Sequence, residues 1–195
     1  MLDTMHRFSS RIVIYLLCGV LGLSAHPHLF IDVMVKFMLT DSTLSGFNVF
    51  WDMDEMYSAS LVDEFDLNRN NRFEKEEFNT MEREAFSFSA QSGFFTVFTW
   101  GKKLLKINKA ENFVAVIQPD SKVRYCFFIP CDLPLAEIAG QDIVVFFNDP
   151  SMFIAFELKK ELVQVSANKD WEGGIGFKKD DYIDLIVLSI KRKQE

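Results

Sequence analysis

The stretch from Asp66 to Glu77, DLNRNNRFEKEE, constrains the fold of this chain more than any other part of it. Counted from its first residue, oxygen-bearing side chains stand at positions 1, 3, 5, 9 and 12, and these are Asp66, Asn68, Asn70, Glu74 and Glu77. This is the ligand spacing of an EF-hand loop, in which position 7, here Arg72, contributes its backbone carbonyl. Because Ca²⁺ takes about six to eight oxygen ligands, we predict a calcium site in this loop.

Two further positions of the loop suit this prediction. Asn71 stands where glycine is usual, and asparagine is the best replacement there because it tolerates a positive φ angle. Phe73 follows where an apolar residue normally anchors the loop. The alternative to a calcium site is a solvated polar turn.

An EF-hand loop requires a helix on each side, and the flanking residues have helical periodicity. Residues 54–65 begin with acidic side chains and then place apolar residues on one face. Residues 74–90 repeat apolar side chains at intervals of three or four positions. We therefore predict a helix–loop–helix over about residues 54–90.

The rest of the chain has the alternation and the turn residues that are typical of β-strands. The expected strands cover residues 29–39, 44–51, 94–100, 103–108, 112–118, 123–130, 142–149, 152–158, 161–166 and 182–190. Glycines at 173, 174 and 176 indicate a loose segment before the last strand. The expected fold class is α+β: one domain over residues 26–195, mainly antiparallel sheet in a sandwich or curled sheet, with the helical pair inserted.

Residues 1–25 have the composition of a secretory signal peptide. Arg7 and Arg11 precede an apolar run over residues 12–23, and Ser24-Ala25 offers small residues for cleavage. We predict cleavage after Ala25, so that the mature chain begins at His26. The alternative is an uncleaved membrane anchor, although this run is short for a bilayer.

The charge of the chain limits its partners. With 28 acidic and 21 basic residues it carries a net charge of −7, so nucleic acid is not an expected partner, whereas cations are suitable ligands. A hydrophobic content of 49% indicates a folded core. After cleavage His26 and His28 are the only histidines left to serve a nucleophile, and no G-x-S-x-G motif is present, so we expect no enzymatic activity.

His26 and His28 are candidate transition-metal ligands. If cleavage follows Ala25, His26 carries a free α-amine beside its imidazole, a combination that binds Ni²⁺, Cu²⁺ or Zn²⁺ well. Pro27 has no amide proton, which excludes the square-planar site that requires a deprotonated second amide. Further ligands would have to be carboxylates, thiols or groups of another protein. The alternative is that both histidines only cap the first strand.

Cys126 and Cys131 are the cysteines of the mature chain, and an exported protein favours disulfides. A strand that ends at Pro130 would hold the two thiols roughly 16 Å apart, too far for a bond. Two free thiols and a disulfide closed by a sharp turn near Pro130 both remain open.

Several motifs in this order resemble a family of bacterial periplasmic proteins of unknown function. They are residues 25–32 (AHPHLFID), 51–58 (WDMDEMYS), the loop at 66–77, 96–104 (TVFTWGKKL) and 144–156 with Asn148-Asp149-Pro150. Members of that family are commonly labelled as the periplasmic component of an uncharacterised ABC-type transport system. Residues 166–195 have no part in the resemblance.

The resemblance implies a periplasmic location and a role near nickel, cobalt or zinc transport, with an inner-membrane metal transporter as the partner. It also implies that His26 and His28 bind the transition metal and that the loop binds calcium, weakly because Asn70 and Asn71 replace the usual Asp and Gly. A metal-binding accessory protein is thus the first expectation. The alternative is a calcium-stabilised structural or binding module with no transition-metal role, and the oligomeric state stays open.

Overall fold

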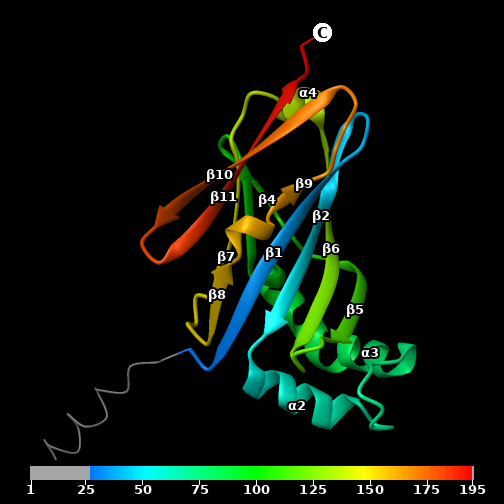
Figure 1. Ribbon diagram of the computed structural model, residues 1–195. Coiled ribbons are helices and arrows are strands. Elements are labelled where there is room, and N and C mark those ends of the chain that lie inside the picture. The colour runs from blue at the N-terminus through cyan, green and yellow to red at the C-terminus, as the bar shows by residue number, and fades with distance from the viewer. Residues whose placement is uncertain (1–26, 195) are drawn as a thin grey trace, which may run out of the picture.

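The alternating strands pair into two sheets that pack face to face, as seen in a computed structural model that describes residues 27–194 (Figure 1). The predicted signal peptide, its cleavage site and His26 lie outside the described residues. Among the helices that are described, none has the length and apolar character needed to cross a membrane. The α+β fold class, with mainly antiparallel sheets in a sandwich, is confirmed.

The first sheet has the strand order β5-β6-β2-β1-β8, and β9 also pairs with β1. Its strands are β1 (Leu29–Leu39), β2 (Thr43–Met53), β5 (Glu111–Ile117), β6 (Val123–Pro134), β8 (Ile154–Leu158) and β9 (Gln164–Val165). β8 and β9 run parallel to β1, and the other pairs are antiparallel. β1 has the predicted bounds, and it forms a hairpin with β2.

The second sheet is antiparallel throughout, in the order β10-β11-β7-β3-β4. Its strands are β3 (Thr96–Trp100), β4 (Lys103–Leu105), β7 (Ile143–Phe147), β10 (Trp171–Asp180) and β11 (Ile183–Arg192). The prediction of a loose segment around Gly173, Gly174 and Gly176 is wrong, because these residues lie within β10. Glycine has a low intrinsic propensity for strands, and backbone pairing with β11 holds these residues in the extended conformation.

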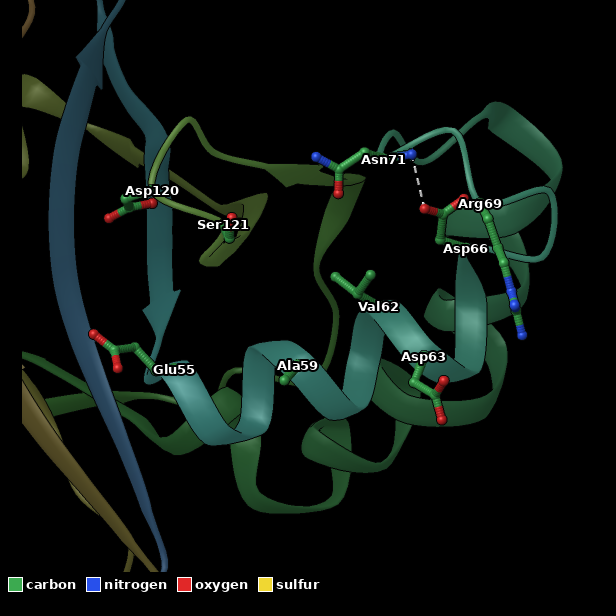
Figure 2. Close-up of a pocket in the computed structure, with 9 residues that line it drawn as sticks. All are labelled: Glu55, Ala59, Val62, Asp63, Asp66, Arg69, Asn71, Asp120 and Ser121. Atoms are coloured by element: carbon green, nitrogen blue, oxygen red, sulfur yellow. Dashed lines mark hydrogen bonds between the residues drawn. The ribbon is translucent and has the colours of Figure 1, made fainter.

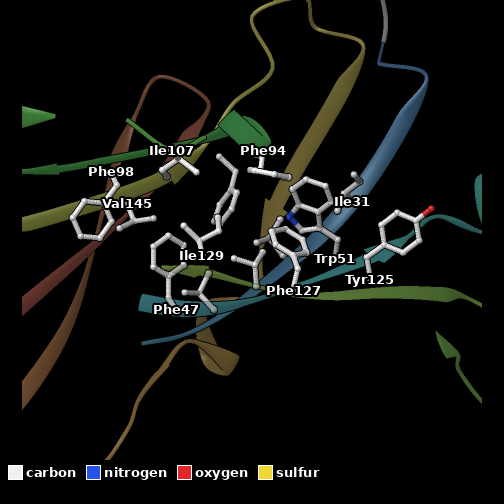
Figure 3. Packing of buried hydrophobic residues seen from close by; sticks show 14 of the residues in the cluster. Ile31, Phe47, Trp51, Phe94, Phe98, Ile107, Tyr125, Phe127, Ile129 and Val145 are labelled. Atoms are coloured by element: carbon white, nitrogen blue, oxygen red, sulfur yellow. The ribbon is translucent and has the colours of Figure 1, made fainter. Parts of the chain in front are cut away.

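The core lies between the sheets and is built from alternate residues of each strand. In β1 the inward positions run from Leu29 through Ile31 and Val33 to Phe37, and all of them are buried. Across the interface, the ring of Phe47 on β2 stacks on that of Phe98 on β3, with centroids 5.8 Å apart (Figure 3). The many phenylalanines of the sequence are therefore largely core residues.

The inserted helices lie across one end of the sandwich (Figure 1). α2 (Glu55–Phe65) begins at Asp54, whose side chain caps it by accepting the amide of Tyr57. α3 (Lys75–Met81) is shorter than the predicted helix to residue 90. It continues as a π-helical segment, Glu82–Phe86, and a 3₁₀ segment, Ser87–Phe95.

The segment after α3 does not return to regular α-helical hydrogen bonding. The hydroxyls of Ser87 and Ser89 hydrogen-bond to the carbonyls of Arg83 and Phe86, which competes with regular helical bonds. Gly93 then takes a positive φ of 57° as the chain turns into β3. β6 extends to Pro134, beyond the expected end at residue 130, and is followed by one turn of helix, α4 (Leu135–Ile138).

Candidate metal centre

The backbone of the 66–77 loop has the geometry of an EF-hand loop. Arg69 and Asn71 have positive φ angles of 57° and 63°, so Asn71 adopts the conformation for which glycine is usual. The carboxylate of Asp66 accepts the amides of Asn70 and Asn71 at 3.2 and 2.9 Å. These two hydrogen bonds hold the loop backbone around the Asp66 carboxylate without the help of a bound ion.

Glu77 closes the other end of the loop. One of its carboxylate oxygens accepts the amide of Leu67 at 3.0 Å, and the other accepts the amide of Glu74 at 2.9 Å. Both Glu77 and Asp66 are buried, with 8% and 6% of their surface exposed. Positions 1 and 12 of the loop, the carboxylates on which calcium depends most, therefore lie inside it.

The two asparagines are held in hydrogen bonds of their own. Their Oδ1 atoms accept the amides of Asn70 and Arg72, while their Nδ2 atoms donate to the carboxylate of Glu74. A calcium ion needs oxygen from Asn68 and Asn70, so each amide must rotate to bind it. The backbone of the loop and the carboxylates of Asp66 and Glu77 are thus suited to Ca²⁺. Glu74, Asn68 and Asn70 instead hydrogen-bond to one another, and Ca²⁺ binding would have to break these hydrogen bonds.

An acidic cleft of about 680 Å³ lies among α2, this loop and the turn between β5 and β6 (Figure 2). It is lined by Glu55, Ala59, Val62, Asp63, Asp66, Arg69, Asn71, Asp120 and Ser121. Of these lining residues four are acidic and one, Arg69, is basic. The cleft therefore favours the approach of cations to Asp66.

The described chain begins beside the start of α2, at the same end of the molecule. The amide of exposed His28 donates to the carbonyl of Phe153 at 2.8 Å, and the two rings lie 5.2 Å apart. Asp54 accepts the amide of Phe30 at 2.9 Å with one oxygen and caps α2 with the other. The first residues of β1 are therefore fixed to both β8 and α2.

His28 and Glu55 line one shared cavity of about 490 Å³. Its lining residues are Pro27, His28, Phe30, Asp54, Glu55, Met56 and Lys122. Glu55 also lines the acidic cleft, so it stands between His28 and the EF-hand-like loop. Across residues 27–194, no three or more His, Cys, Asp and Glu side chains are grouped closely enough to hold a metal ion.

Sequence reasoning missed Glu55 as a neighbour of His28. The two residues are far apart in the chain, and no local motif joins them. The register of the β1–β2 hairpin could have indicated that the two residues are neighbours. It pairs Ile31 with Met53, so residue 28 lies just past the end of β2, where α2 begins.

Cys126 and Cys131 are free thiols on β6, so the alternative with two free thiols is confirmed. Burial raises the pKa of both thiols, to about 12 for Cys131. Neither is therefore a thiolate at neutral pH, the form that binds metals.

Asp149 positions the loop that holds His28. Its buried carboxylate accepts the hydroxyl and amide of Ser151 and the amides of Phe153 and Ile154. Burial alone would raise the pKa of Asp149, but these hydrogen bonds outweigh it and lower the pKa below its usual value. Asp149 thereby fixes the carbonyl and the ring of Phe153 against His28.

We expect Asp149→Asn to lower the free energy of unfolding by about 1–3 kcal/mol at neutral pH, because an amide replaces a carboxylate that accepts several donors. The depressed pKa means that the wild-type carboxylate stabilises the fold above its unfolded pKa of about 3.9 and loses this contribution as the pH falls through the folded value. Urea unfolding of both proteins between neutral and acidic pH measures the difference, which should shrink with acid.

The matched control for this measurement is Asp41→Asn, at an exposed aspartate in the turn between β1 and β2. It should stay within about 0.5 kcal/mol of wild type. A difference between Asp149→Asn and wild type that is the same at every pH would contradict the role given to the carboxylate.

The fold and the site together define a class: a two-sheet β-sandwich with an EF-hand-like helix–loop–helix across the end at which β1 begins. The chain belongs to a family of proteins of unknown function, DUF1007, whose model matches residues 11–173. No curated protein matches the sequence.

Proposed function

We propose that this protein is an exported, periplasmic metal-binding accessory protein that serves an inner-membrane transporter of Ni²⁺, Co²⁺ or Zn²⁺. The transition metal is held by His26 and His28 at the mature amino terminus. The observation that carries the proposal is that His28 and Glu55 line one cavity at the end of the sandwich where β1 begins. The resemblance to periplasmic components of ABC-type transport systems supports the same role.

The chemistry of the donors suits borderline metal ions. Two imidazoles and an α-amine are nitrogen ligands that Ni²⁺, Co²⁺ and Zn²⁺ accept, and a carboxylate is a common addition. Both oxygens of Asp54 already accept backbone amides, which leaves Glu55 as the carboxylate we assign. Pro27 keeps the two histidines close in the chain while it limits backbone freedom.

A metal titration of the mature protein, beginning at His26, tests this proposal. We expect His26→Ala/His28→Ala to abolish measurable Ni²⁺, Co²⁺ and Zn²⁺ binding in calorimetry, and Glu55→Gln to weaken it about tenfold or more. The matched control is Glu64→Gln, an exposed glutamate near the other end of the same helix. Unchanged affinity in the double variant would refute the ligand assignment.

We also propose that the 66–77 loop binds Ca²⁺ weakly and acts as a structural clamp on α2 and α3. The buried carboxylates of Asp66 and Glu77 support this role. Bound calcium would stabilise the fold by about 2.7 kcal/mol at a concentration one hundred times its dissociation constant.

The second candidate function, a calcium-stabilised module without a transition metal, rests on the loop alone. It predicts a rise in melting temperature with Ca²⁺ and no response to Ni²⁺ or Zn²⁺. The calorimetric titration above therefore separates the two candidates.

A further inference from the structure

The outer strand of the second sheet, β10, presents a long and regular unpaired edge. All ten of its residues pair with β11 without a shift in register. β11 in turn pairs with β7 only through Ile186, Val187 and Leu188, so the far end of the hairpin extends past the sheet (Figure 1). The family match ends at residue 173, so most of this hairpin lies beyond it.

The other edges among the described strands are protected against pairing. β4 has only three residues. β5 contains a register shift and a positive φ angle at Asn112. A 3₁₀ turn, Lys160–Leu162, separates β8 from β9. Short strands, bulges and interruptions are usual protections of sheet edges, and β10 has none of these three; its protection is limited to the charged side chains of Glu172, Lys178, Lys179 and Asp180.

We propose that β10 pairs with β10 of a second copy of this chain, antiparallel and about a twofold axis at Ile175. In this arrangement Ile175 lies opposite its own copy, and the two second sheets join into one continuous sheet. A strand edge with unpaired backbone groups supplies the hydrogen bonds of such a pairing. Its symmetry makes each side-chain contact occur twice.

The side chains of β10 are complementary to themselves in this register. Glu172 stands opposite Lys178 of the second copy, and both side chains are exposed on the same face of the strand. Within one chain they have only surface partners, Lys191 and Asp142, at 3.3 and 3.5 Å. Such exposed pairs are weak and do not prevent the new contacts.

The other face of β10 adds apolar contacts. Phe177, which is 38% exposed, comes opposite Gly173 of the second copy, where its ring would meet the Val165 side chain that lies over Gly173. Trp171 comes opposite Lys179 of the second copy, a cation–aromatic pair. A Cβ atom on Gly173 would meet Val165 of β9, so β9 covers the face of β10 and leaves its edge open.

Other registers lose this complementarity. A shift by one residue is excluded, because a twofold axis keeps each side chain on its own face of the sheet. A shift by two residues in one direction sets Glu172 against Asp180, and in the other direction it sets Glu172 against Gly176 and leaves only Asp170 opposite Lys178. Both shifts remove the two Glu172–Lys178 contacts.

Charge reversal tests the pairing in the mature, full-length chain. Sedimentation equilibrium at micromolar and higher concentrations should show a monomer–dimer equilibrium for wild type. Glu172→Lys alone and Lys178→Glu alone each set like charges opposite one another twice, and each should raise the dissociation constant about tenfold or more. An equimolar mixture of the two variants should dimerise again, because every facing pair is then of opposite sign.

The mixture also answers the concern that a variant simply misfolds, since a misfolded chain would not recover pairing. Glu161→Lys, which makes the same charge change on the exposed 3₁₀ turn, is the matched control and should dimerise like wild type. A wild-type chain that stays monomeric overturns the proposal. So does dimerisation that both single variants retain, or a mixture that stays monomeric.

Discussion

Replacing Phe47 with alanine is expected to lower the free energy of unfolding by about 3–5 kcal/mol. The Phe47 side chain is fully buried. Its ring contacts that of Phe37 in its own sheet, with centroids 5.6 Å apart, and stacks on Phe98 of the opposite sheet at 5.8 Å (Figure 3). Its removal leaves a cavity at the place where the two sheets meet.

Urea unfolding followed by tryptophan fluorescence measures this loss. Phe88→Ala is the matched control, because the Phe88 ring is 64% exposed and its truncation should cost within about 0.5 kcal/mol. If Phe47→Ala cost no more than its control, the two sheets would not be packed together at Phe47.

Replacing Glu77 with alanine is expected to cost about 2–4 kcal/mol without calcium and to remove any stabilisation by calcium. Without calcium the loss arises because the amides of Leu67 and Glu74 lose their acceptors in a partly buried position. With calcium the loop also lacks the carboxylate at position 12, which normally supplies two ligand oxygens.

Melting curves recorded with EGTA and with millimolar Ca²⁺ separate these two effects. Glu76→Ala is the matched control, since Glu76 is the exposed neighbour of Glu77 in the first turn of α3. It should preserve both the stability and the response to calcium. A Glu77→Ala protein that keeps the full calcium response would exclude the loop as the calcium site.

The agreement between sequence and structure is closest where local chemistry is sufficient. β1 spans the predicted residues because alternating apolar side chains bury one face of a strand wherever it pairs. The loop at 66–77 folds as its spacing predicts because Asp66, Asn68 and Asn70 bond to amides only a few residues away.

The agreement fails where distant segments decide the outcome. Gly173, Gly174 and Gly176 have little strand propensity, yet pairing with β11 makes them part of a ten-residue strand. The helix expected to residue 90 ends at Met81, because the chain must turn into β3 to reach its partner β7.

The sequence by itself determined that this chain is β-rich, has an EF-hand-like insertion and carries two histidines shortly after the apolar run over residues 12–23. These features can be recognised from the periodicity of apolar residues and from the spacing of residues close in the chain, which do not depend on tertiary contacts. Only the tertiary structure decided that His28 shares a cavity with Glu55, that Asp149 fixes the loop beside it, and that β10 is an open edge. Each of these depends on which strands lie side by side, and that is set by packing of the whole core.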